Sequence, residues 1–338
     1  MKRHFVTIKD IARELKISVA TVSRALRDTY DVNQETRQLV LRKAEEMNYK
    51  PNFNATGLVK NSSHNIAIIL PSITNYYFST VVTGIQEVAH KRGYNIVLYI
   101  TNDSAERERD ILNDLPLGNI DGLLVSVCSR PGQNDHFGQI IADGIPIVFF
   151  DRVAPDIRAS KIMQDDYQGA YEAVEHLIAQ GYKKIAHIAG PAGLLFTERR
   201  MEGFISAMKE HGLPVKDEWI IYSGFSMDFG KRDALQLLQC KTVPDAIFAV
   251  NDRKAIGAML ALKERQIRIG AQMGIIGFTN DPMCEIISPT LTTVEEPALE
   301  VGRKSCEFLL NHINKKSFPP QELTLPTKLV VRESTVRG

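Results

Sequence analysis

The stretch Ser18–Leu26, with the sequence SVATVSRAL, decides how the first part of this chain folds. Ser18 is suited to cap a helix here, because its hydroxyl can accept a hydrogen bond from a free backbone N–H of the first turn. At about 100° per residue, one side of the helix is apolar and faces a small core: Val22, Ala25 and Leu26. The opposite side carries a small residue and two cations: Ala20, Arg24 and Arg27.

A second helix is expected immediately upstream, over Thr7–Leu15. Thr7 and Asp10 fit a capping box, with Asp in place of the more common Glu. Its inner stripe is apolar: Ile8, Ile11, Ala12 and Leu15. Only Lys16-Ile17-Ser18 separates the two helices, and a turn of this length is typical of a helix-turn-helix, whose second helix enters the major groove of DNA. A helical hairpin that only packs against its neighbours fits the same spacing.

A third helix is expected over Gln34–Met47, capped by Asn33. Its apolar positions complete a three-helix core: Leu39, Val40, Ala44 and Met47. The helix ends before Pro51, which forbids its continuation. Residues 52–63 form a polar linker in which only a short helix around Ala55–Lys60 is possible. Gly57 makes that helix marginal, because glycine costs about 1 kcal/mol in a helix interior.

The net charge of +1 is distributed unevenly along the 338 residues. Residues 1–60 carry a net charge of +5, and the remaining 278 residues carry −4. A basic head on a mildly acidic body favours a nucleic-acid contact made by the head alone. A solvated helical bundle would show the same asymmetry.

The cysteine and histidine patterns predict neither disulfides nor a metal site. Four scattered cysteines have no metal-ligand spacing and are expected to be reduced core thiols: Cys128, Cys240, Cys284 and Cys306. The eight histidines form no ligand pair, and we expect no cofactor. Met1–Phe5 leads into the first helix without the apolar segment of a signal peptide, and the apolar runs are of strand length. We therefore expect a cytoplasmic protein.

From Asn65 onward, apolar strands alternate with helices in two series. The first series has four strands: Ile66–Leu70, Ile96–Ile100, Gly122–Val127 and Pro146–Phe150. Its helices are Phe78–Arg92, Ala105–Leu115 and Gln133–Asp143. The second series also has four strands: Ile185–Ala189, Ile220–Ser223, Ala246–Val250 and Met273–Gly277. Its helices are Gln168–Gln180, Thr197–His211, Asp228–Cys240 and Lys254–Arg265. This alternation predicts two doubly wound lobes with parallel sheets.

The end of the chain supplies three further elements, Leu291–Glu295, the helix Ala298–Asn314 and the strand Thr327–Arg332. We place the head at 1–51, the hinge at 52–63 and the core at 64–338. The N-lobe is expected to comprise about 64–163 and 291–325. The C-lobe is expected to comprise about 164–290 plus the C-terminal strand.

Ligands of open parallel sheets bind beyond the carboxyl ends of the strands, which makes the residues there informative. An aromatic cluster, Tyr76-Tyr77-Phe78, follows the first strand, and Asp151-Arg152 follows the fourth. In the second series, the corresponding polar residues include Arg200, Asn251 and Thr279. Aromatic faces beside such donors and acceptors suit a sugar or a small polar ring. Each residue could alternatively be a helix cap or an ordinary surface residue.

Motifs that would name a reaction are absent from the sequence. It has no G-x-G-x-x-G after a strand, no G-x-x-x-x-G-K-[ST] and no G-x-S-x-G. A doubly wound fold would permit an enzyme. We nevertheless expect no catalytic residues, and we expect that the chain is not an enzyme.

Taken together, these residues resemble the lac/gal repressor (LacI/GalR) family of bacterial transcription regulators over essentially the whole chain. The resemblance is carried by six motifs: Val6–Ala12, Ser18–Leu26, Thr36-Arg37, Asn48-Tyr49-Lys50-Pro51-Asn52, Arg200–Phe204 and Asn251-Asp252. It implies a DNA-binding head, a hinge helix and a periplasmic-binding-protein-like core that dimerises.

The resemblance also implies roles for single residues in DNA binding. Val19 and Ala20 would face base edges beside Arg24, which can bind guanine in bidentate fashion. Phosphates would be held at the helix N-termini and by nearby hydroxyls: Thr7, Ser18, Thr21, Ser23 and Asn33. In the hinge, Ala55 would contact the minor groove and Leu58 would open a base step. Thr56-Gly57 departs from the pairs that relatives often carry there, so we expect a hinge that orders only on DNA.

In the core, the resemblance implies an effector site in the cleft between the lobes. Its residues would be Tyr76, Tyr77, Phe78, Asp151, Arg152, Arg200, Phe225, Asn251 and Thr279. Thr279 stands where relatives more often carry a carboxylate, so the resemblance does not transfer the effector's identity.

These observations predict a homodimeric repressor of carbohydrate-use genes. It would bind a palindromic operator, associate with the nucleoid when bound and respond to a small, sugar-like effector. A solute-binding protein of a sugar transporter shares the two-lobed architecture, but it would be exported and would need no basic head. A sugar-modifying enzyme with an accessory head is the other alternative, and it would show turnover.

Overall fold

The computed structural model describes residues 6–26, 32–49, 62–129, 135–315 and 318–337. The chain divides into two compact units, Met1–Ser63 and His64–Gly338, which we call the head and the core.

The described residues of the head form three helices: α1 (Ile8–Leu15), α2 (Val19–Leu26) and α3 (Gln34–Glu46). Asp10 accepts a hydrogen bond from the backbone N–H of Thr7 at 2.9 Å, which fixes the start of α1. Lys16 ends α1 with a left-handed backbone, and the chain turns directly into α2. The buried residues come from all three helices: Ile11, Ala12, Val22, Ala25, Val40 and Ala44. The predicted helix-turn-helix arrangement is confirmed.

One prediction for the core of the head is wrong, because Leu39 is not buried. Leu39 is 46% exposed, whereas Val40 and Ala44 are buried. Val40 and Ala44 are four residues apart and share one helix face, and Leu39 lies about 100° away from Val40 around the axis.

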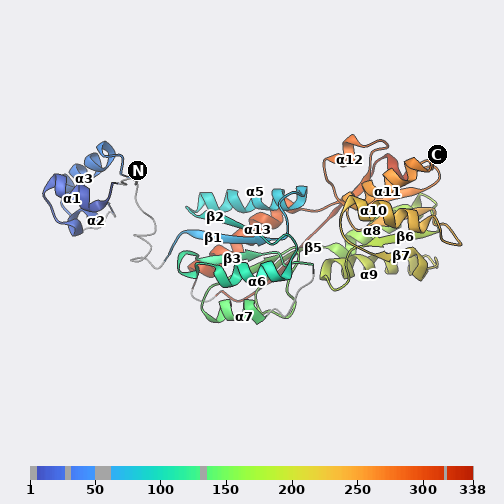
Figure 1. Ribbon diagram of the computed structural model, residues 1–338, viewed down its shortest axis with the longest axis horizontal. Coiled ribbons are helices and arrows are strands. Elements are labelled where there is room, and N and C mark those ends of the chain that lie inside the picture. Colours follow the sequence, from blue (N-terminus) through green and yellow to red (C-terminus); the bar gives the residue numbers. More distant parts are fainter. Residues whose placement is uncertain (1–5, 27–31, 50–61, 130–134, 316–317, 338) are drawn as a thin grey trace. The chain divides into compact units, whose positions relative to one another are not determined.

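The first sheet of the core has the strand order β11-β5-β4-β3-β1-β2, and every pairing in it is parallel. Its strands are β1 (Asn65–Leu70), β2 (Asn95–Ile100), β3 (Gly122–Val125), β4 (Ile147–Phe150), β5 (Ser160–Gln164) and β11 (Glu322–Leu325). Its helices are α5 (Tyr76–Lys91), α6 (Ala105–Asp114), α7 (Asp135–Ala142) and α13 (Ala298–Asn314). We call this sheet and its helices the first lobe (Figure 1).

The second sheet has the order β12-β10-β9-β8-β6-β7, and only the edge strand β12 runs antiparallel. Its strands are β6 (Ile185–Ala189), β7 (Ile220–Tyr222), β8 (Ala246–Ala249), β9 (Gly274–Thr279), β10 (Thr292–Glu295) and β12 (Lys328–Val330). Its helices are α8 (Asp166–Ala179), α9 (Leu195–Glu210), α10 (Met227–Leu237), α11 (Asp252–Glu264) and α12 (Met283–Ile286). These elements form the second lobe.

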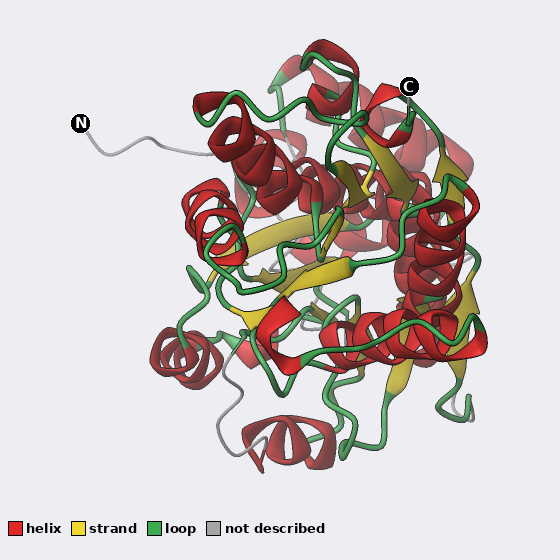
Figure 2. Cartoon of the chain, turned by 90° about the vertical axis from the view of Figure 1, so that its right-hand side faces the viewer, coloured by secondary structure: helices red, strands yellow, loops and turns green. Residues whose placement is uncertain are grey.

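Each sheet is buried on both faces, as parallel sheets require. In β1, Ile66, Ile68 and Leu70 pack under α5 and α13, while Ala67 and Ile69 face α6 and α7. In the second lobe, α10 and α11 cover one face and α8 and α9 the other. Figure 2 shows the strands enclosed by helices. The predicted class, a small helical head plus two doubly wound lobes, is confirmed.

Two expectations about the core are corrected. Leu291–Glu295 was assigned to the first lobe, but β10 pairs with β9 in the second sheet, because successive strands joined by a short connection tend to be neighbours. The sequence did not predict the strand β5, because it begins with the polar residues Ser160 and Lys161 and has no continuous apolar run. The chain therefore passes between the lobes three times, after β5, after β10 and after β11.

Within the described residues, every helix is too short or too polar to cross a membrane. The same part of the chain contains no group of three or more His, Cys, Asp or Glu side chains placed to hold a metal ion.

Candidate functional site

The outer face of α2 carries the residues predicted to contact base edges. Ser18 caps this helix, because its hydroxyl accepts a hydrogen bond from the Thr21 N–H at 3.0 Å. Val19, Ala20 and Arg24 are exposed, whereas Thr21 and Ser23 are half-buried. The exposed face thus offers two small apolar side chains and one guanidinium. These groups can contact thymine methyl groups and guanine, respectively.

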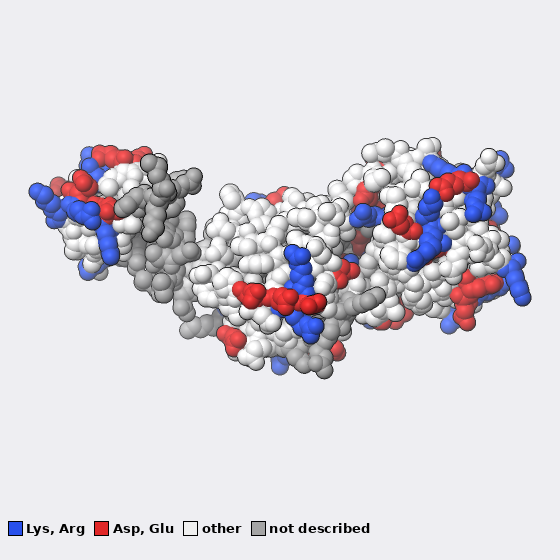
Figure 3. All heavy atoms as spheres, in the orientation of Figure 1, with Lys and Arg blue, Asp and Glu red and all other residues white. Residues whose placement is uncertain are grey.

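The helix N-termini in the head are also capped as predicted. Asn33 accepts a hydrogen bond from the Glu35 N–H at 2.9 Å and starts α3, as Thr7 starts α1. The dipole of a helix makes such a start favourable for a phosphate group. Figure 3 shows lysine and arginine side chains projecting from the surface of the head. Ala55 and Leu58, the predicted hinge contacts, lie outside the described residues.

The candidate effector residues of the core lie at or after the carboxyl ends of parallel strands. Tyr76, Tyr77 and Phe78 begin α5, which follows β1, and Asp151 and Arg152 directly follow β4. On the second lobe, Arg200 lies on α9 after β6, Asn251 follows β8 and Thr279 ends β9. This edge of an open sheet is where ligands bind.

Arg152 brings aromatic rings of both lobes together. Its guanidinium carbon lies 5.8 Å from the ring centre of Phe78 in the first lobe. It also lies 5.9 Å from that of Phe196 and 5.0 Å from that of Phe225, both in the second lobe. Asp103 holds the guanidinium through a 2.8 Å ion pair. The arrangement is a set of ring faces around a cation, and it can hold one face of a small ring-shaped ligand.

Arg200 is the centre of a buried ion cluster at the passages between the lobes. Its Nε donates to Asp166 at 2.8 Å and its terminal nitrogens donate to Glu296 and to the Val250 carbonyl, each at 2.5 Å. Asp166 follows the first passage, and Glu296 lies on the second. The guanidinium carbon of Arg200 also lies 3.6 Å from the ring centre of Phe278. The cluster thus ties two of the three connecting segments to the second lobe.

Gln164 extends this cluster into the first lobe. Its amide nitrogen donates to Asp151 at 3.2 Å and to Asp166 at 3.4 Å, while its oxygen accepts from the Tyr77 hydroxyl at 3.2 Å. Burial raises the pKa of Asp151 to about 6, although Arg152 opposes the shift. Burial likewise raises the pKa of Asp166, with Arg200 acting in the opposite direction. A hydrogen-bonded chain therefore joins candidate residues of both lobes.

The remaining candidates have local structural partners. Asn251 caps α11 by accepting from the Lys254 N–H at 2.8 Å, and its amide donates to the Phe225 carbonyl at 3.2 Å. Phe78 is buried in the core of the first lobe. Tyr76 is 44% exposed, and with Thr279 it lines a cavity of about 350 Å³ beside the segment Glu295–Glu300. This cavity is therefore lined by candidate residues of both lobes, Tyr76 on α5 and Thr279 on β9.

Comparison with known proteins now decides the family. A model of the lacI family of bacterial regulatory proteins matches residues 7–52, and a model of the periplasmic binding protein-like domain matches 174–335. A ribose operon repressor of Halalkalibacterium halodurans is 34% identical over 332 residues, which are 98% of each chain. The chain belongs to the lacI family of bacterial regulatory proteins.

Solved structures of lacI-family proteins have the same fold. A lac repressor dimer bound to operator and the anti-inducer ONPF matches with a TM-score of 0.87 and 26% identity, over 98% of this chain and all of that one. A LacI-family transcriptional regulator from Enterococcus faecium with bound ribose matches with a TM-score of 0.70 and 28% identity, over 80% of this chain and 98% of that one. The resemblance inferred from the head and core motifs is confirmed.

Sequence reasoning missed four members of the lacI-family core's interlobe cluster: Gln164, Asp166, Phe196 and Glu296. Gln164 is the last residue of β5, a strand that the sequence did not predict, and Asp166 comes two residues after it. Glu296 follows the expected strand Leu291–Glu295, so the rule applied to the other strand ends would have found it. Phe196 lies in a helix turn without a local signal that distinguishes it from a core residue.

The raised pKa of Asp151 predicts how an Asp151→Asn variant of this lacI-family protein responds to pH. Between about pH 4 and 6 the folded state holds a proton that the unfolded state has released, so the Asp151 contribution to stability falls as pH rises. Asparagine has no such proton. The variant's free energy of unfolding, relative to wild type, should therefore increase between pH 4 and 7.5, on the order of 1–3 kcal/mol. Urea unfolding at both pH values measures it; a difference independent of pH would contradict the shift.

Proposed function

We propose that this protein is a homodimeric repressor that binds a palindromic operator and is released from it, or recruited to it, by a small carbohydrate. The cluster that links Arg152, the three phenyl rings and Arg200 across both lobes carries the proposal. A ligand that contacts both sides of this cluster stabilises one relative orientation of the lobes. A coupling of about 1–3 kcal/mol between the two sites would change operator occupancy substantially.

We assign DNA binding to residues 1–51, hinge function to 52–63 and effector binding to 64–338. In the head, the exposed Val19, Ala20 and Arg24 would read bases, and the capped helix N-termini would hold phosphates. The nine candidate residues of the core, together with Phe196, would bind the effector. The protein would act in the cytoplasm, on the nucleoid when bound to DNA.

A carbohydrate is the effector class that these side chains favour. The rings of Phe78, Phe196 and Phe225 can contact the apolar face of a sugar. Asp151 and Asn251 supply acceptors and a donor for hydroxyl groups. The similarity to a ribose operon repressor and to a regulator with bound ribose supports a pentose as the first sugar to test.

An apolar sheet edge supports the proposal of a dimer. β2 is the edge strand of the first sheet, and its Val97 and Leu98 are 38% and 37% exposed. Proteins usually protect such an edge with charge, proline or a covering element, and a second copy of the chain would cover it. The similarity to a lac repressor dimer supports the same arrangement.

The deciding experiment measures binding of the full chain to the DNA upstream of its own gene by fluorescence anisotropy. It is carried out with and without ribose and other sugars at several salt concentrations. We expect steep salt dependence, a dimer by sedimentation and a sugar-dependent midpoint. Operator preference without any sugar response would reject the carbohydrate effector, and equal affinity for random duplex would reject the repressor.

Leu58→Ala tests the hinge separately. If Leu58 opens a base step in the minor groove, its truncation removes the apolar wedge and should weaken operator binding at least about tenfold. Sugar affinity should stay nearly unchanged, because the core retains all its residues. Calorimetry for the sugar and anisotropy for the operator measure the two quantities. Unchanged operator affinity would remove Leu58 from the interface.

A further inference from the structure

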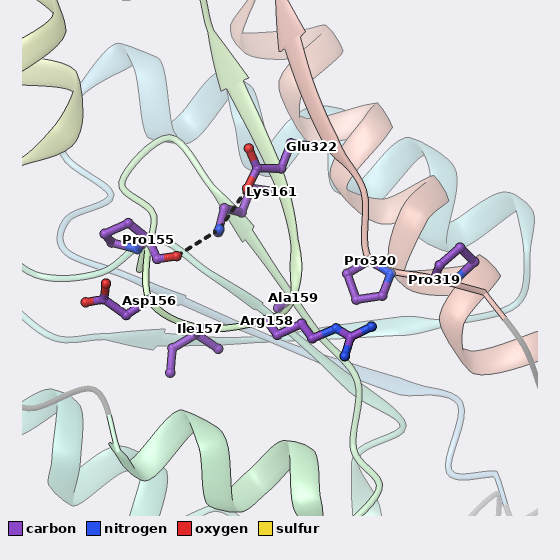
Figure 4. A pocket seen from close by; sticks show the side chains of 9 residues that line it. All are labelled: Pro155, Asp156, Ile157, Arg158, Ala159, Lys161, Pro319, Pro320 and Glu322. Atoms are coloured by element: carbon purple, nitrogen blue, oxygen red, sulfur yellow. Dashed lines mark hydrogen bonds and ion pairs between the residues drawn. The ribbon is translucent and has the colours of Figure 1, made fainter.

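A second cavity lies in the first lobe, at the opposite ends of the strands from the candidate effector residues. It has a volume of about 350 Å³ and lies at the amino ends of β5 and β11, the edge of the sheet (Figure 4). Its walls are the loop Pro155–Ala159, which precedes β5, and the segment Pro319–Glu322, which leads into β11. We call it the edge cavity.

Backbone and side-chain hydrogen bonds connect the two walls of the edge cavity. The Lys161 N–H donates to the Gln321 carbonyl at 2.9 Å, and the Gln321 N–H donates to the Ser160 hydroxyl at 3.1 Å. The pairing of β5 with β11 continues this connection along both strands. The cavity is therefore formed by the fold itself and does not depend on a ligand for its walls.

Lys161 places a buried cation at the edge cavity. The residue is only 7% exposed, and its amino group donates to the Pro155 carbonyl at 3.1 Å and to Glu322 at 2.8 Å. An ammonium group has three donors. Among the described residues these two acceptors are its partners, so one N–H is left for a ligand. Glu322 has a side chain that is 60% exposed and can turn into solvent.

Arg158 supplies a second cation at a different part of the cavity. It is exposed, and the described part of the chain offers its guanidinium neither an ion pair nor a hydrogen bond. In Figure 4 the guanidinium extends toward Pro320, away from the amino group of Lys161, while the carboxylate of Asp156 points away from both. The rings of Pro319 and Pro320 and the side chain of Ile157 provide the apolar parts of the lining.

We propose that the edge cavity binds a small organic diacid. One carboxylate of the ligand would bind Lys161 in place of Glu322, and the other would bind Arg158. Glu322 is then a carboxylate of the protein that occupies half of the site in the absence of ligand. Two cations that lie apart in a cavity with apolar lining residues (Figure 4) match a ligand with two acidic ends joined by a short hydrocarbon chain. The charged lining residues carry no net charge, since Asp156 and Glu322 balance Arg158 and Lys161, so binding rests on the two local contacts and not on a general attraction for anions.

Titration calorimetry of the full chain with glutarate tests the proposal, at low salt and pH 7.5. We expect saturable binding of one glutarate per chain. Lys161→Met and Arg158→Gln should each weaken it about tenfold or more, because each removes a charge-assisted hydrogen bond. Glu322→Gln should strengthen it severalfold, because the competing carboxylate is gone. The control Lys231→Gln, in an exposed ion pair of the second lobe, should change nothing.

Acetate and inorganic phosphate serve as the other probes. Both should bind at least about tenfold more weakly than glutarate, since neither has two carboxylates joined by a hydrocarbon chain. The proposal is overturned if Glu322→Gln binds no glutarate, or if Lys161→Met and Arg158→Gln bind it as wild type does. Phosphate binding as tight as that of glutarate would also overturn the diacid. Glu322→Gln and Arg158→Gln alter exposed side chains, so they remain informative if Lys161→Met fails to fold.

Discussion

Replacing Arg200 with methionine should lower the free energy of unfolding by about 3–5 kcal/mol and abolish the response to effector. Arg200 is 2% exposed and neutralises two buried carboxylates, Asp166 and Glu296. Methionine fills much of the volume but leaves both carboxylates without a cation. Since carboxylates can escape this cost by binding protons, the loss should be smaller at pH 5 than at pH 8. Urea unfolding at the two pH values measures it.

The neighbouring residue provides the matched control. Arg199 lies on the same helix and pairs with Glu202 at 2.8 Å, but both side chains are more than half exposed. Arg199→Met should therefore cost less than about 1 kcal/mol. The additional substitutions Asp166→Asn and Glu296→Gln should recover much of the stability lost in Arg200→Met. Equal effects of the Arg199 and Arg200 substitutions would contradict the role given to the cluster.

Asp233→Ala should destabilise the second lobe by a similar amount, about 3–5 kcal/mol. The ion pair of Asp233 with Lys254 is 2.8 Å long, and both side chains are fully buried between α10 and α11. Without Asp233 the Lys254 ammonium remains in the core with neutral partners only, the Ala189 carbonyl and the Ser223 hydroxyl. Burial already lowers the pKa of Lys254, and removal of Asp233 should lower it further. Chemical denaturation at pH 7 measures the loss.

The same helices contain a surface pair for comparison. Lys231 and Glu264 lie 2.6 Å apart with exposed side chains, so Glu264→Ala should cost less than about 1 kcal/mol. The double variant Asp233→Leu/Lys254→Met should regain stability over Asp233→Ala, because no charge is left in the core. A double variant as unstable as the single one would show that packing, and not the ion pair, dominates this region.

The sequence predicted most helices and strands of the core because their apolar runs are buried on both faces. β1 illustrates this, since all residues from Ile66 to Leu70 are buried. β5 lacks such a continuous apolar run: Lys161 is as buried as an apolar residue, but only because Glu322 and the Pro155 carbonyl compensate its charge. Glu322 is distant in the sequence, and no local pattern can predict such a partner.

The candidate site was predictable only residue by residue. Strand ends indicated Asp151, Arg152 and Asn251, because the carboxyl edge of a parallel sheet is defined by the strands themselves. The strand-end rule also covers Glu296, which follows Leu291–Glu295, but the pairing of Arg200 with Asp166 and Glu296 was not predictable, because it forms at the passages between the lobes. The assignment of Leu291–Glu295 to the first lobe failed for the same reason. The run is apolar enough for either sheet, and only its pairing with β9 decides.

The three passages between the lobes also determine when each lobe can complete its fold during synthesis on the ribosome. When residues 64–164 have been synthesised, the first lobe still lacks α13 and β11, so one face of its sheet has no complete cover. The sheet of the second lobe is likewise incomplete until β10 and β12 have been synthesised. At about 5–20 residues per second, both lobes remain incomplete on the nascent chain until the last helix and strands are made. The three-helix core formed by α1, α2 and α3 is complete once Glu46 has been made, so it can fold long before either lobe.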